Sequence, residues 1–274
     1  MFDLHMHSKN SHDGKDTLDA LCLSAIEKGV KGLAITDHID MHSYVERNAY
    51  QTIQQSIADT KAAREKYKDR LKVLCGVELG GYAYDPEMAK KVLDLTDYDV
   101  VIGSLHYVRK GMFDSAYSKQ IYDEKLSDAQ IISFIGQYFD ELQEISEMAD
   151  FDVLAHLTCP MRYINYVYKR GIDVMLFEDK ITEILKKIIE RGIALEVNTS
   201  CYTPKYGYSF DPDEKILRLY KSLGGELITL GSDAHKAGNI ALGFDAALDM
   251  LKKVGFGYYC YFEQRKAQKV MLDS

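Results

Sequence analysis

The sequence lacks the segments that mark membrane-spanning or secreted proteins. No apolar run approaches the ~20 residues that a helix needs to cross a bilayer. The N-terminus has no basic segment followed by an apolar stretch and a cleavage site, so it does not resemble a secretory signal. We therefore expect a soluble, cytoplasmic protein that does not associate with membranes.

Cysteine is scarce, and its pattern does not suggest disulfide bonds. The five cysteines are Cys22, Cys75, Cys159, Cys201 and Cys260. This odd count and the absence of a C-x-x-C pair argue against a disulfide framework. Cys22 and Cys75 lie within apolar patterns and are expected to be small core residues.

Long runs of lysine and arginine are also missing. The formal net charge of −8 argues against general affinity for nucleic acid or for an anionic membrane surface. It leaves room for a local basic pocket that binds a small phosphate. We expect a small phosphorylated molecule as the partner rather than a nucleic acid polymer, while the oligomeric state is not indicated.

No linker divides the chain. Its 274 residues are 46% hydrophobic and 28% charged, which is ordinary for a globular protein and sufficient for a large core without disulfides. There is no proline- or glycine-rich linker, low-complexity tract or composition break. We therefore expect residues 1–274 to form a single domain.

Strand-like and helix-like segments alternate from end to end. Short apolar runs predict strands, and apolar stripes at helical spacing predict helices. About seven β/α units result, an order that favours a parallel sheet with outer helices. The predicted strands contain residues 2–4, 33–35, 73–77, 100–102, 153–155, 193–197 and 227–230, with a further edge strand at 258–262. The predicted helices contain residues 18–26, about 53–70, 86–92, 131–145, 181–189, 216–220 and 247–251.

Metal-ligand side chains stand at or just after the ends of most predicted strands. If these strands are parallel and close into a barrel, their C-terminal ends meet at one mouth and the side chains converge there. All of the side chains offer nitrogen or oxygen ligands, so the set predicts a metal site. The candidate ligands are His5, His7, Asp13, His38, Glu78, His106, His156, Asp233 and His235.

The spacing of these residues favours more than one metal ion. His5 and His7 are two residues apart, so on a strand both rings face the same way. Asp233 and His235 repeat that spacing, and the two oxygens of Glu78 can bridge two cations. Nine ligands are too many for one tetrahedral zinc, so we expect two or three divalent ions. Because no thiolate is present, zinc, manganese and iron all remain open.

Other polar residues near the set have alternative or supporting roles. His12 competes with Asp13 for a ligand position, and the motif spacing favours Asp13. Asp37 is expected to orient a ligand rather than to bind metal itself. Arg162 follows His156 by six residues and is the candidate phosphate contact, because guanidinium matches phosphate geometry.

Three further candidates for the pocket are weaker. Lys169 and Arg170 are less favoured phosphate contacts than Arg162. His42 lies just beyond the second-strand motif and is expected to line a substrate pocket.

The combined motifs resemble the PHP (polymerase and histidinol phosphatase) superfamily over residues 1 to about 245. The segments that carry the resemblance are Asp3-Leu4-His5-Met6-His7-Ser8, Thr36-Asp37-His38, Gly76-Val77-Glu78, Gly103-Ser104-Leu105-His106, Ala155-His156 and Gly231-Ser232-Asp233-Ala234-His235. The resemblance implies a distorted (β/α)7 barrel with parallel strands, outer helices and a trinuclear metal centre at the strand C-terminal ends. It also implies three ligand groups: His5, His7, Glu78 and Asp233; Glu78, His106 and His156; and Asp13, His38 and His235.

Within that superfamily, the chain length and residues 195–200 look most like the monofunctional histidinol-phosphate phosphatases of histidine biosynthesis. The resemblance therefore implies hydrolysis of L-histidinol phosphate to L-histidinol and inorganic phosphate. We hypothesise attack by a hydroxide that bridges the first two metals, since clustered metals activate water and clamp phosphoryl oxygens. Asp233 or His235 is expected to pass a proton to the leaving alkoxide.

Two other functions remain alternatives. A PHP phosphoesterase acting on nucleotides or other small phosphate esters would use the same ligand set. A non-catalytic metal-binding module is less favoured, because decay to such a role usually tolerates the loss of ligands. Activity on histidinol phosphate, nucleoside monophosphates and a generic aryl phosphate would separate these possibilities.

Overall fold

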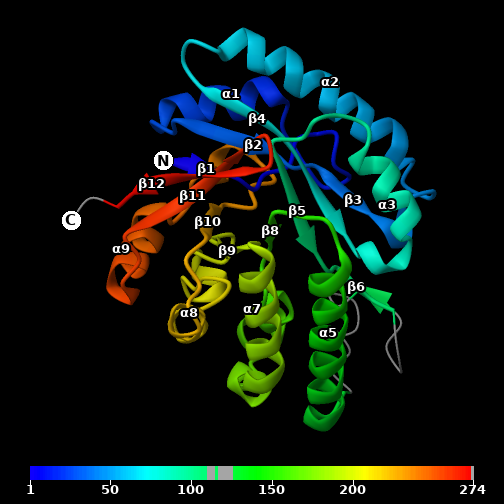
Figure 1. The fold of residues 1–274 in the computed structure, drawn as a ribbon, viewed down its shortest axis with the longest axis vertical. Coiled ribbons are helices and arrows are strands. Elements are labelled where there is room, and N and C mark those ends of the chain that lie inside the picture. The colour runs from blue at the N-terminus through cyan, green and yellow to red at the C-terminus, as the bar shows by residue number, and fades with distance from the viewer. Residues whose placement is uncertain (110–114, 117–125, 273–274) are drawn as a thin grey trace.

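A ring of parallel strands with helices around it forms the centre of the structure (Figure 1). The structure is a computed structural model that describes residues 1–109, 115–116 and 126–272. In this described part, the strands of the ring are β1 (Phe2–Asp3), β2 (Gly32–Ile35), β4 (Lys72–Gly80), β5 (Val100–Ser104), β8 (Val153–Leu154), β9 (Ala194–Asn198) and β10 (Ile228–Gly231).

Every neighbouring pair in the order β1-β2-β4-β5-β8-β9-β10 is parallel. β3 (His38–Asp40) continues the line of β2 along β4, because Ile35 pairs with Cys75 and His38 pairs with Glu78 in the same register. The ends of the ring meet where the Leu4 backbone N–H donates to the Leu230 carbonyl at 3.0 Å. These pairings confirm the predicted (β/α)7 barrel.

The helices cover the outside of this ring (Figure 1). They are α1 (Leu18–Glu27), α2 (Ala49–Tyr67), α3 (Pro86–Leu93), α5 (Asp128–Met148), the one-turn α6 (Cys159–Met161), α7 (Glu178–Arg191), α8 (Glu214–Ser222) and α9 (Phe244–Val254). Thr17 caps α1 through the Ala20 N–H, and Asp85 caps α3 just before Pro86. Gly192 ends α7 with a φ of 69°. The predicted start of α2 is several residues late, because Ala49 is the one buried residue of its first turn and a single small residue makes no apolar stripe.

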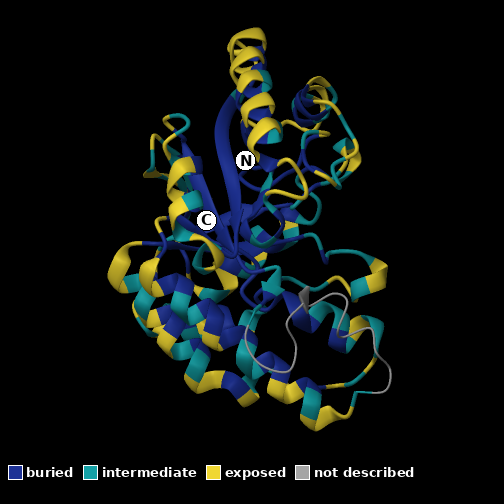
Figure 2. Ribbon diagram, turned by 90° about the vertical axis from the view of Figure 1, so that its right-hand side faces the viewer, coloured by how far each residue is buried: buried dark blue, intermediate teal, exposed yellow. Residues whose placement is uncertain are grey.

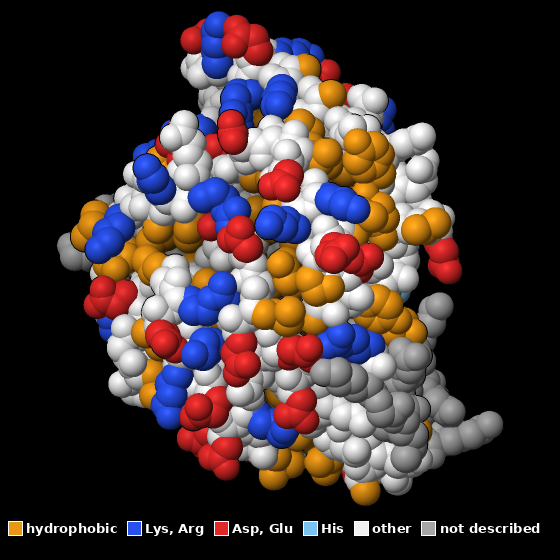
Figure 3. Space-filling model, turned by 45° about the vertical axis from the view of Figure 1, so that its right-hand side comes forward, with side chains coloured by type: hydrophobic (Ala, Val, Ile, Leu, Met, Phe, Trp, Pro, Cys, Tyr) orange, Lys and Arg blue, Asp and Glu red, His pale blue; other side chains and the backbone are white. Residues whose placement is uncertain are grey.

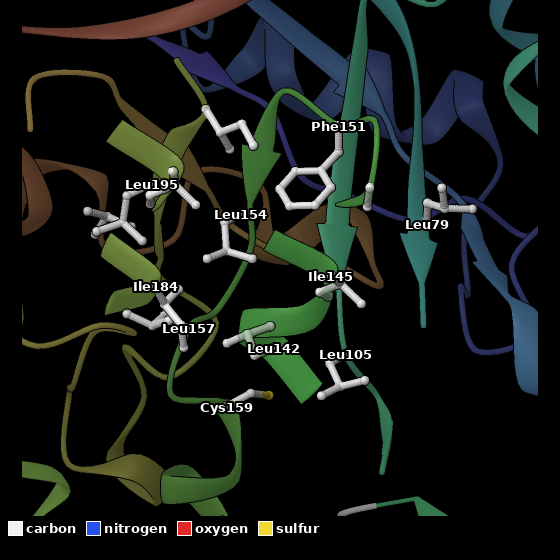
Figure 4. Close-up of a cluster of buried hydrophobic side chains, with 14 of the residues drawn as sticks. Leu79, Leu105, Leu142, Ile145, Phe151, Leu154, Leu157, Cys159, Ile184 and Leu195 are labelled. Carbon is white, nitrogen blue, oxygen red and sulfur yellow. The ribbon is translucent and has the colours of Figure 1, made fainter. Parts of the chain in front are cut away.

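The main hydrophobic core lies between the outer surface of the strands and the helices (Figure 2). Figure 4 shows part of it, where Leu154 of β8 and Leu195 of β9 meet Ile184 of α7 and Leu142 and Ile145 of α5. All five side chains are at most 1% exposed. Burying one such side chain stabilises the fold by roughly 1.5–3 kcal/mol, so this layer fixes the strands that carry the candidate site.

A smaller apolar cluster fills the inside of the barrel. It contains Leu74 of β4, Val100 and Ile102 of β5, and Leu4 just after β1, and all are at most 2% exposed. Phe262 closes this cluster from the N-terminal end of the strands. The barrel is therefore packed with side chains below the mouth, and only its C-terminal end is available for a site.

Phe262 belongs to an antiparallel hairpin of β11 (Tyr258–Glu263) and β12 (Lys266–Met271). The prediction of a strand at residues 258–262 is confirmed. β12 was not predicted, because its alternation of lysines and glutamine with smaller or apolar residues resembles an exposed segment. The hairpin is fastened to the barrel by the rings of Tyr261 and Phe2, which stack with centroids 3.9 Å apart.

The cysteines form no disulfide framework, as predicted, and the visible surface carries charges of both signs. All five cysteines are buried, and none of them forms a disulfide bond. In Figure 3, acidic and basic side chains are interspersed over the visible face. Among the described residues, no helix combines the length and the apolar character needed to cross a membrane.

Candidate metal centre

The strand pattern explains why the candidate ligands face one mouth of the barrel. Along β4, Leu74 and Glu78 are four residues apart and therefore point to the same side, which is the barrel interior. Leu74 lies in the apolar interior, whereas Glu78 lies near the C-terminal end of the strand and is 0% exposed. His38 stands beside it in the β3–β4 register. The other candidates come from the segments that follow β1, β5, β8 and β10.

The first predicted group converges around Oε2 of Glu78. Nε2 of His5 lies 3.3 Å from this oxygen, and Nε2 of His7 lies 3.5 Å from it. Oδ1 of Asp233 lies 3.2 Å from His7 Nε2 and 3.8 Å from His5 Nε2. Both histidines are completely buried, so their rings face this point and not solvent.

The second predicted group converges on the other oxygen of Glu78. Nε2 of His106 lies 3.2 Å from Oε1, and Nε2 of His156 lies 3.0 Å from it. Glu78 therefore presents one oxygen to each group, which is the arrangement a bridging carboxylate requires.

The third predicted group lies nearer the rim. Oδ2 of Asp13 is 2.9 Å from His235 Nε2 and 3.5 Å from His38 Nε2. His38 also belongs to a possible site with Glu78, because its Nδ1 lies 2.6 Å from Oε2. His12 lies further out, where both of its ring nitrogens are 3.0 Å from a guanidinium nitrogen of Arg47. The geometry thus favours Asp13 over His12 as the member of this group.

These side chains pass a simple test of fitness for metal ions. Four overlapping sets of three ligand atoms each lie within 4.8 Å of one another. His5 Nε2, His7 Nε2 and Glu78 Oε2 are buried without any hydrogen-bond partner. A buried polar atom left without a partner costs about 1–3 kcal/mol, so clusters of such atoms call for a ligand. Imidazole and carboxylate donors together suit zinc, manganese or iron.

Burial and neighbouring charges set the protonation of the group. Burial lowers the pKa of His7 to about 3, so its ring is neutral at neutral pH. Burial alone would raise the pKa of Glu78, yet the surrounding histidines hold it well below its usual value. Burial also opposes protonation of His106, but Glu78 and Asp40 raise its pKa to about 9. Without metal, the site therefore holds an ionised Glu78 next to a His106 ring that carries a proton, and a cation binding to His106 would displace that proton.

Two candidate ligands have strained backbones. His156 has a φ of 28° and Asp233 a φ of 51°, in a region that residues other than glycine rarely adopt. Such conformations persist only where the surrounding structure enforces them, and they cluster at functional sites. The strain aims both side chains at Glu78 and its neighbours from loops that follow β8 and β10.

Sequence reasoning missed two carboxylates that support the histidines. Oε1 of Glu196 lies 2.7 Å from His5 Nδ1, and Oδ1 of Asp40 lies 2.8 Å from His106 Nδ1. Both carboxylates are buried, and each faces the ring nitrogen opposite the one that points at Glu78. Glu196 could have been found from the sequence, because an acidic residue between Leu195 and Val197 is unusual in a strand buried on both faces.

Asp37 supports the first loop and does not touch a histidine ring directly. Its carboxylate accepts hydrogen bonds from the Ser8 N–H and from the hydroxyls of Ser8, Ser11 and Ser56, at 2.6–3.0 Å. The hydroxyl of Ser11 in turn lies 3.4 Å from Nδ1 of His7. Asp37 therefore fixes the loop between His7 and Asp13.

A cavity of about 220 Å³ opens over these groups. Arg162 reaches it with a side chain only 12% exposed, and its Nη1 donates to Ser200 Oγ at 3.2 Å and lies 4.0 Å from Oδ2 of Asp233. His42 lines the same cavity and stacks on Tyr107 with centroids 4.5 Å apart. The full lining is His12, Asp13, His38, Asp40, His42, Arg47, His106, His156, Cys159, Arg162, Tyr163, Asp233 and His235.

Arg170, one of the weaker phosphate candidates, is engaged elsewhere. Its guanidinium donates to the carboxylate of Asp128, at the start of α5, and to the Leu126 carbonyl. Arg47 was not predicted, yet it lines the same cavity as Arg162 and pairs with Asp40 at 3.1 Å. The cavity lining therefore contains two guanidinium groups.

Comparisons with known proteins match this chain over nearly its whole length. The model of the family described as "PHP domain" matches residues 3–200. A "Probable histidinol-phosphatase" of Clostridium acetobutylicum is 31% identical over 269 residues, covering 97% of this chain and 98% of the relative. One of Thermotoga maritima is 29% identical, with 94% of each chain covered.

Solved structures share the fold. The crystal structure of histidinol phosphate phosphatase from Lactococcus lactis, described as complexed with zinc, L-histidinol and phosphate, superposes with a TM-score of 0.74. It is 23% identical to this chain, and 98% of both chains is covered.

Proposed function

The chain belongs to the PHP domain family, and we propose that it is a metal-dependent phosphatase that hydrolyses L-histidinol phosphate to L-histidinol and inorganic phosphate. One observation carries the proposal: histidine and carboxylate atoms from six separate segments converge at one barrel mouth. They do so in a chain that is 31% identical to a relative named "Probable histidinol-phosphatase". The reaction belongs to histidine biosynthesis.

The three residue groups around Glu78 would hold the metals. The first is His5, His7, Glu78 and Asp233, the second Glu78, His106 and His156, and the third Asp13, His38 and His235. Divalent ions bound there would lower the pKa of water towards 7 and neutralise phosphoryl oxygens. The donor set fits three ions of zinc, manganese or iron.

Arg162 is the proposed anchor for the phosphate group. Its guanidinium is mostly buried at the cavity wall, so it can donate two parallel hydrogen bonds in an environment with little water. His42 lines the same cavity and stacks on Tyr107, and the organic half of the substrate would lie beside the His42 ring.

Asp233 is the stronger candidate for protonating the leaving alkoxide. Its Oδ1 faces His5 and His7, whereas its Oδ2 accepts a hydrogen bond from the side chain of Asn198 at 3.3 Å. Oδ2 is therefore turned away from those two histidines. Burial would raise the pKa of Asp233, but His5, His7 and His235 hold it well below its usual value, so Oδ2 would pass on a proton taken from water rather than store one. His235 has both nitrogens engaged, because Nδ1 lies 2.9 Å from the Asp233 carbonyl and Nε2 lies beside Asp13.

The test compares substrates on metal-reconstituted protein. Phosphate release from L-histidinol phosphate, from nucleoside monophosphates and from an aryl phosphate is measured at equal protein and metal concentrations. We expect kcat/KM to be highest for L-histidinol phosphate. A preference for a nucleoside monophosphate would assign the alternative PHP phosphoesterase activity, and no turnover of any ester would leave a metal-binding module.

A further inference from the structure

Glu196 contacts two of the candidate metal ligands without belonging to any of the three ligand groups. It is on β9, is 1% exposed, and uses both carboxylate oxygens. Oε1 lies 2.7 Å from His5 Nδ1, while Oε2 accepts the His156 backbone N–H at 3.0 Å and the Asn198 amide at 3.1 Å. One side chain thus contacts a candidate ligand of the first metal and a candidate ligand of the second.

The contact with His5 determines which ring nitrogen can bind a cation. A carboxylate beside Nδ1 favours a proton on that nitrogen, and this leaves a lone pair on Nε2. Nε2 is the atom that faces Glu78 at 3.3 Å and Asp233 at 3.8 Å, and it has no hydrogen-bond partner. Glu196 therefore selects the ring form that presents its lone pair to the first group.

The contact with His156 offsets a strained backbone. His156 has a φ of 28°, a conformation costly for a residue with a side chain. Its N–H is fixed by the hydrogen bond to Glu196 Oε2 at 3.0 Å, and its Nε2 then lies 3.0 Å from Glu78 Oε1. The same carboxylate thus orients a ring in one group and a main chain in the other.

The neighbouring strand leaves room for this carboxylate. A Cβ atom at Gly231, the last residue of β10, would lie 2.1 Å from Glu196 Oε1 and 2.6 Å from the Cβ of His5. Any side chain there would displace Glu196 from His5. An equivalent pair supports His106, because a Cβ at Gly80 would lie 2.1 Å from Oδ1 of Asp40. The packing of both carboxylates depends on a glycine one strand away.

We propose that Glu196 is a positioning residue that holds His5 and His156 together in their metal-binding geometry and so couples the first and second metal sites. The inference rests on the proposed metal centre and adds a specific demand. Loss of the Glu196 carboxylate must weaken the sites built on His5 and His156 and spare the site of Asp13, His38 and His235.

The substitution Glu196→Gln tests this demand with almost no change in volume. Two fixed donors, the His156 N–H and the Asn198 amide, surround the Oε2 position, so the glutamine carbonyl must occupy it. The glutamine NH2 then faces His5 Nδ1. Binding metal through Nε2 needs a proton on Nδ1, and in the variant this N–H would point at another donor.

The experiment measures zinc affinity by chelator competition for metal-free wild-type and Glu196→Gln protein. We expect the first site, built on His5, to bind zinc about 10–100-fold more weakly in the variant, as is typical when a hydrogen-bond partner of a ligand is lost. The second site should weaken less, because the His156 N–H keeps a carbonyl acceptor. The third site should keep its wild-type affinity. The proposal would be overturned if Glu196→Gln had the same zinc affinity as wild type at every site. It would also be overturned if all three sites weakened equally, as a general structural defect would cause.

A matched control is Asp152→Asn. Asp152 is also a mostly buried carboxylate, and it accepts the Val101 N–H at 2.8 Å at the far end of the barrel. Its loss should leave all three zinc affinities unchanged. If Glu196→Gln fails to fold, long-range ¹⁵N NMR of zinc-loaded wild-type protein decides the matter. His5 should carry its proton on Nδ1, and a proton on Nε2 would refute the role of Glu196.

These outcomes separate the inference from the proposed function. Wild-type protein that binds no zinc would remove the metal centre itself. Wild-type protein that binds zinc with the same affinities as Glu196→Gln would remove only the role of Glu196.

Discussion

The two ends of the barrel both carry buried charged groups and a surface hollow, but they satisfy those groups differently. The hollow at the N-terminal end is the larger, about 450 Å³ against about 220 Å³ over the candidate metal centre. Its charges are paired within the protein: Lys72 with Glu263 at 2.8 Å, and Arg64 with Asp99. At the C-terminal end, His5 Nε2, His7 Nε2 and Glu78 Oε2 lack hydrogen-bond partners.

Asp99 and Glu78 show the contrast most clearly. Asp99 accepts the Cys75 N–H of β4 at 2.8 Å and the Gln264 N–H at 3.2 Å, so it links β4 to the turn of the β11–β12 hairpin. Glu78 has a ring nitrogen from each of five histidines at 2.6–3.5 Å from its two oxygens. The size of a hollow therefore does not identify a functional site here. The site is identified instead by several such ring nitrogens and carboxylate oxygens that converge within 4.8 Å of one another.

The largest expected effect comes from Glu78→Gln. This change removes the negative charge of the carboxylate that faces both of the first two groups, while the side-chain volume stays almost the same. Stabilisation of a transition state by metal is worth several kcal/mol, and each ~1.4 kcal/mol is tenfold in rate. We expect kcat/KM to fall by about 1000-fold or more with an unchanged circular dichroism spectrum. A variant that keeps activity within tenfold of wild type would contradict the shared role of Glu78.

The next prediction concerns the C-terminal end of the barrel and tests whether Asp13 or His12 is the ligand of the third site. Asp13 Oδ2 is 2.9 Å from His235 Nε2, whereas His12 lies against Arg47. We expect Asp13→Asn to lower kcat/KM by about tenfold or more, equivalent to at least ~1.4 kcal/mol, and to reduce the metal content. His12→Asn should retain the full metal content. The reverse result would assign the third site to His12.

Arg162→Ala should have a smaller effect that is concentrated in substrate binding. A hydrogen bond to a charged group contributes about 1.5–3 kcal/mol, so we expect kcat/KM for L-histidinol phosphate to fall about 10–100-fold. Arg162→Lys keeps the charge but loses the planar fork, and it should recover only part of the loss. Unchanged KM and kcat in Arg162→Ala would remove this residue from the site.

Asp99→Asn should have the smallest effect on activity, because it changes only the N-terminal end. Loss of a buried carboxylate that accepts backbone N–H groups is expected to lower the free energy of unfolding by about 1–3 kcal/mol. Urea unfolding measures that loss, and kcat/KM of the folded variant should equal that of wild type. A large drop in turnover would mean that the two ends are coupled and that the comparison fails.

Much of the fold follows from local signals in the sequence. Thr17, Asp85 and Gly192 are helix boundary residues whose side chains or conformations act within one turn, so they were readable without tertiary structure. The barrel followed from alternation of strands and helices. β3 and β12 could not be predicted in this way, because His38–Asp40 is short and polar and β12 exists only through pairing with β11.

The candidate ligands could be recognised by residue type and by position at strand ends, and the structure brings all nine to one mouth. The supporting residues could not. Glu196 and Asp40 are far from their histidines in sequence, by 191 and 66 positions, and only the closed ring brings them together. Arg47 reaches the cavity through its pair with Asp40 and carries no motif of its own.

The most direct test of the account is the metal content of the protein. Metal-free chain is reconstituted with zinc or manganese, freed of excess metal, and measured by elemental analysis beside Glu78→Gln and Asp99→Asn. The account predicts two or three ions per chain, three being favoured, with the same content in Asp99→Asn and a marked loss in Glu78→Gln. Wild-type protein without stoichiometric metal, or a Glu78→Gln variant that retains all of it, would contradict the account.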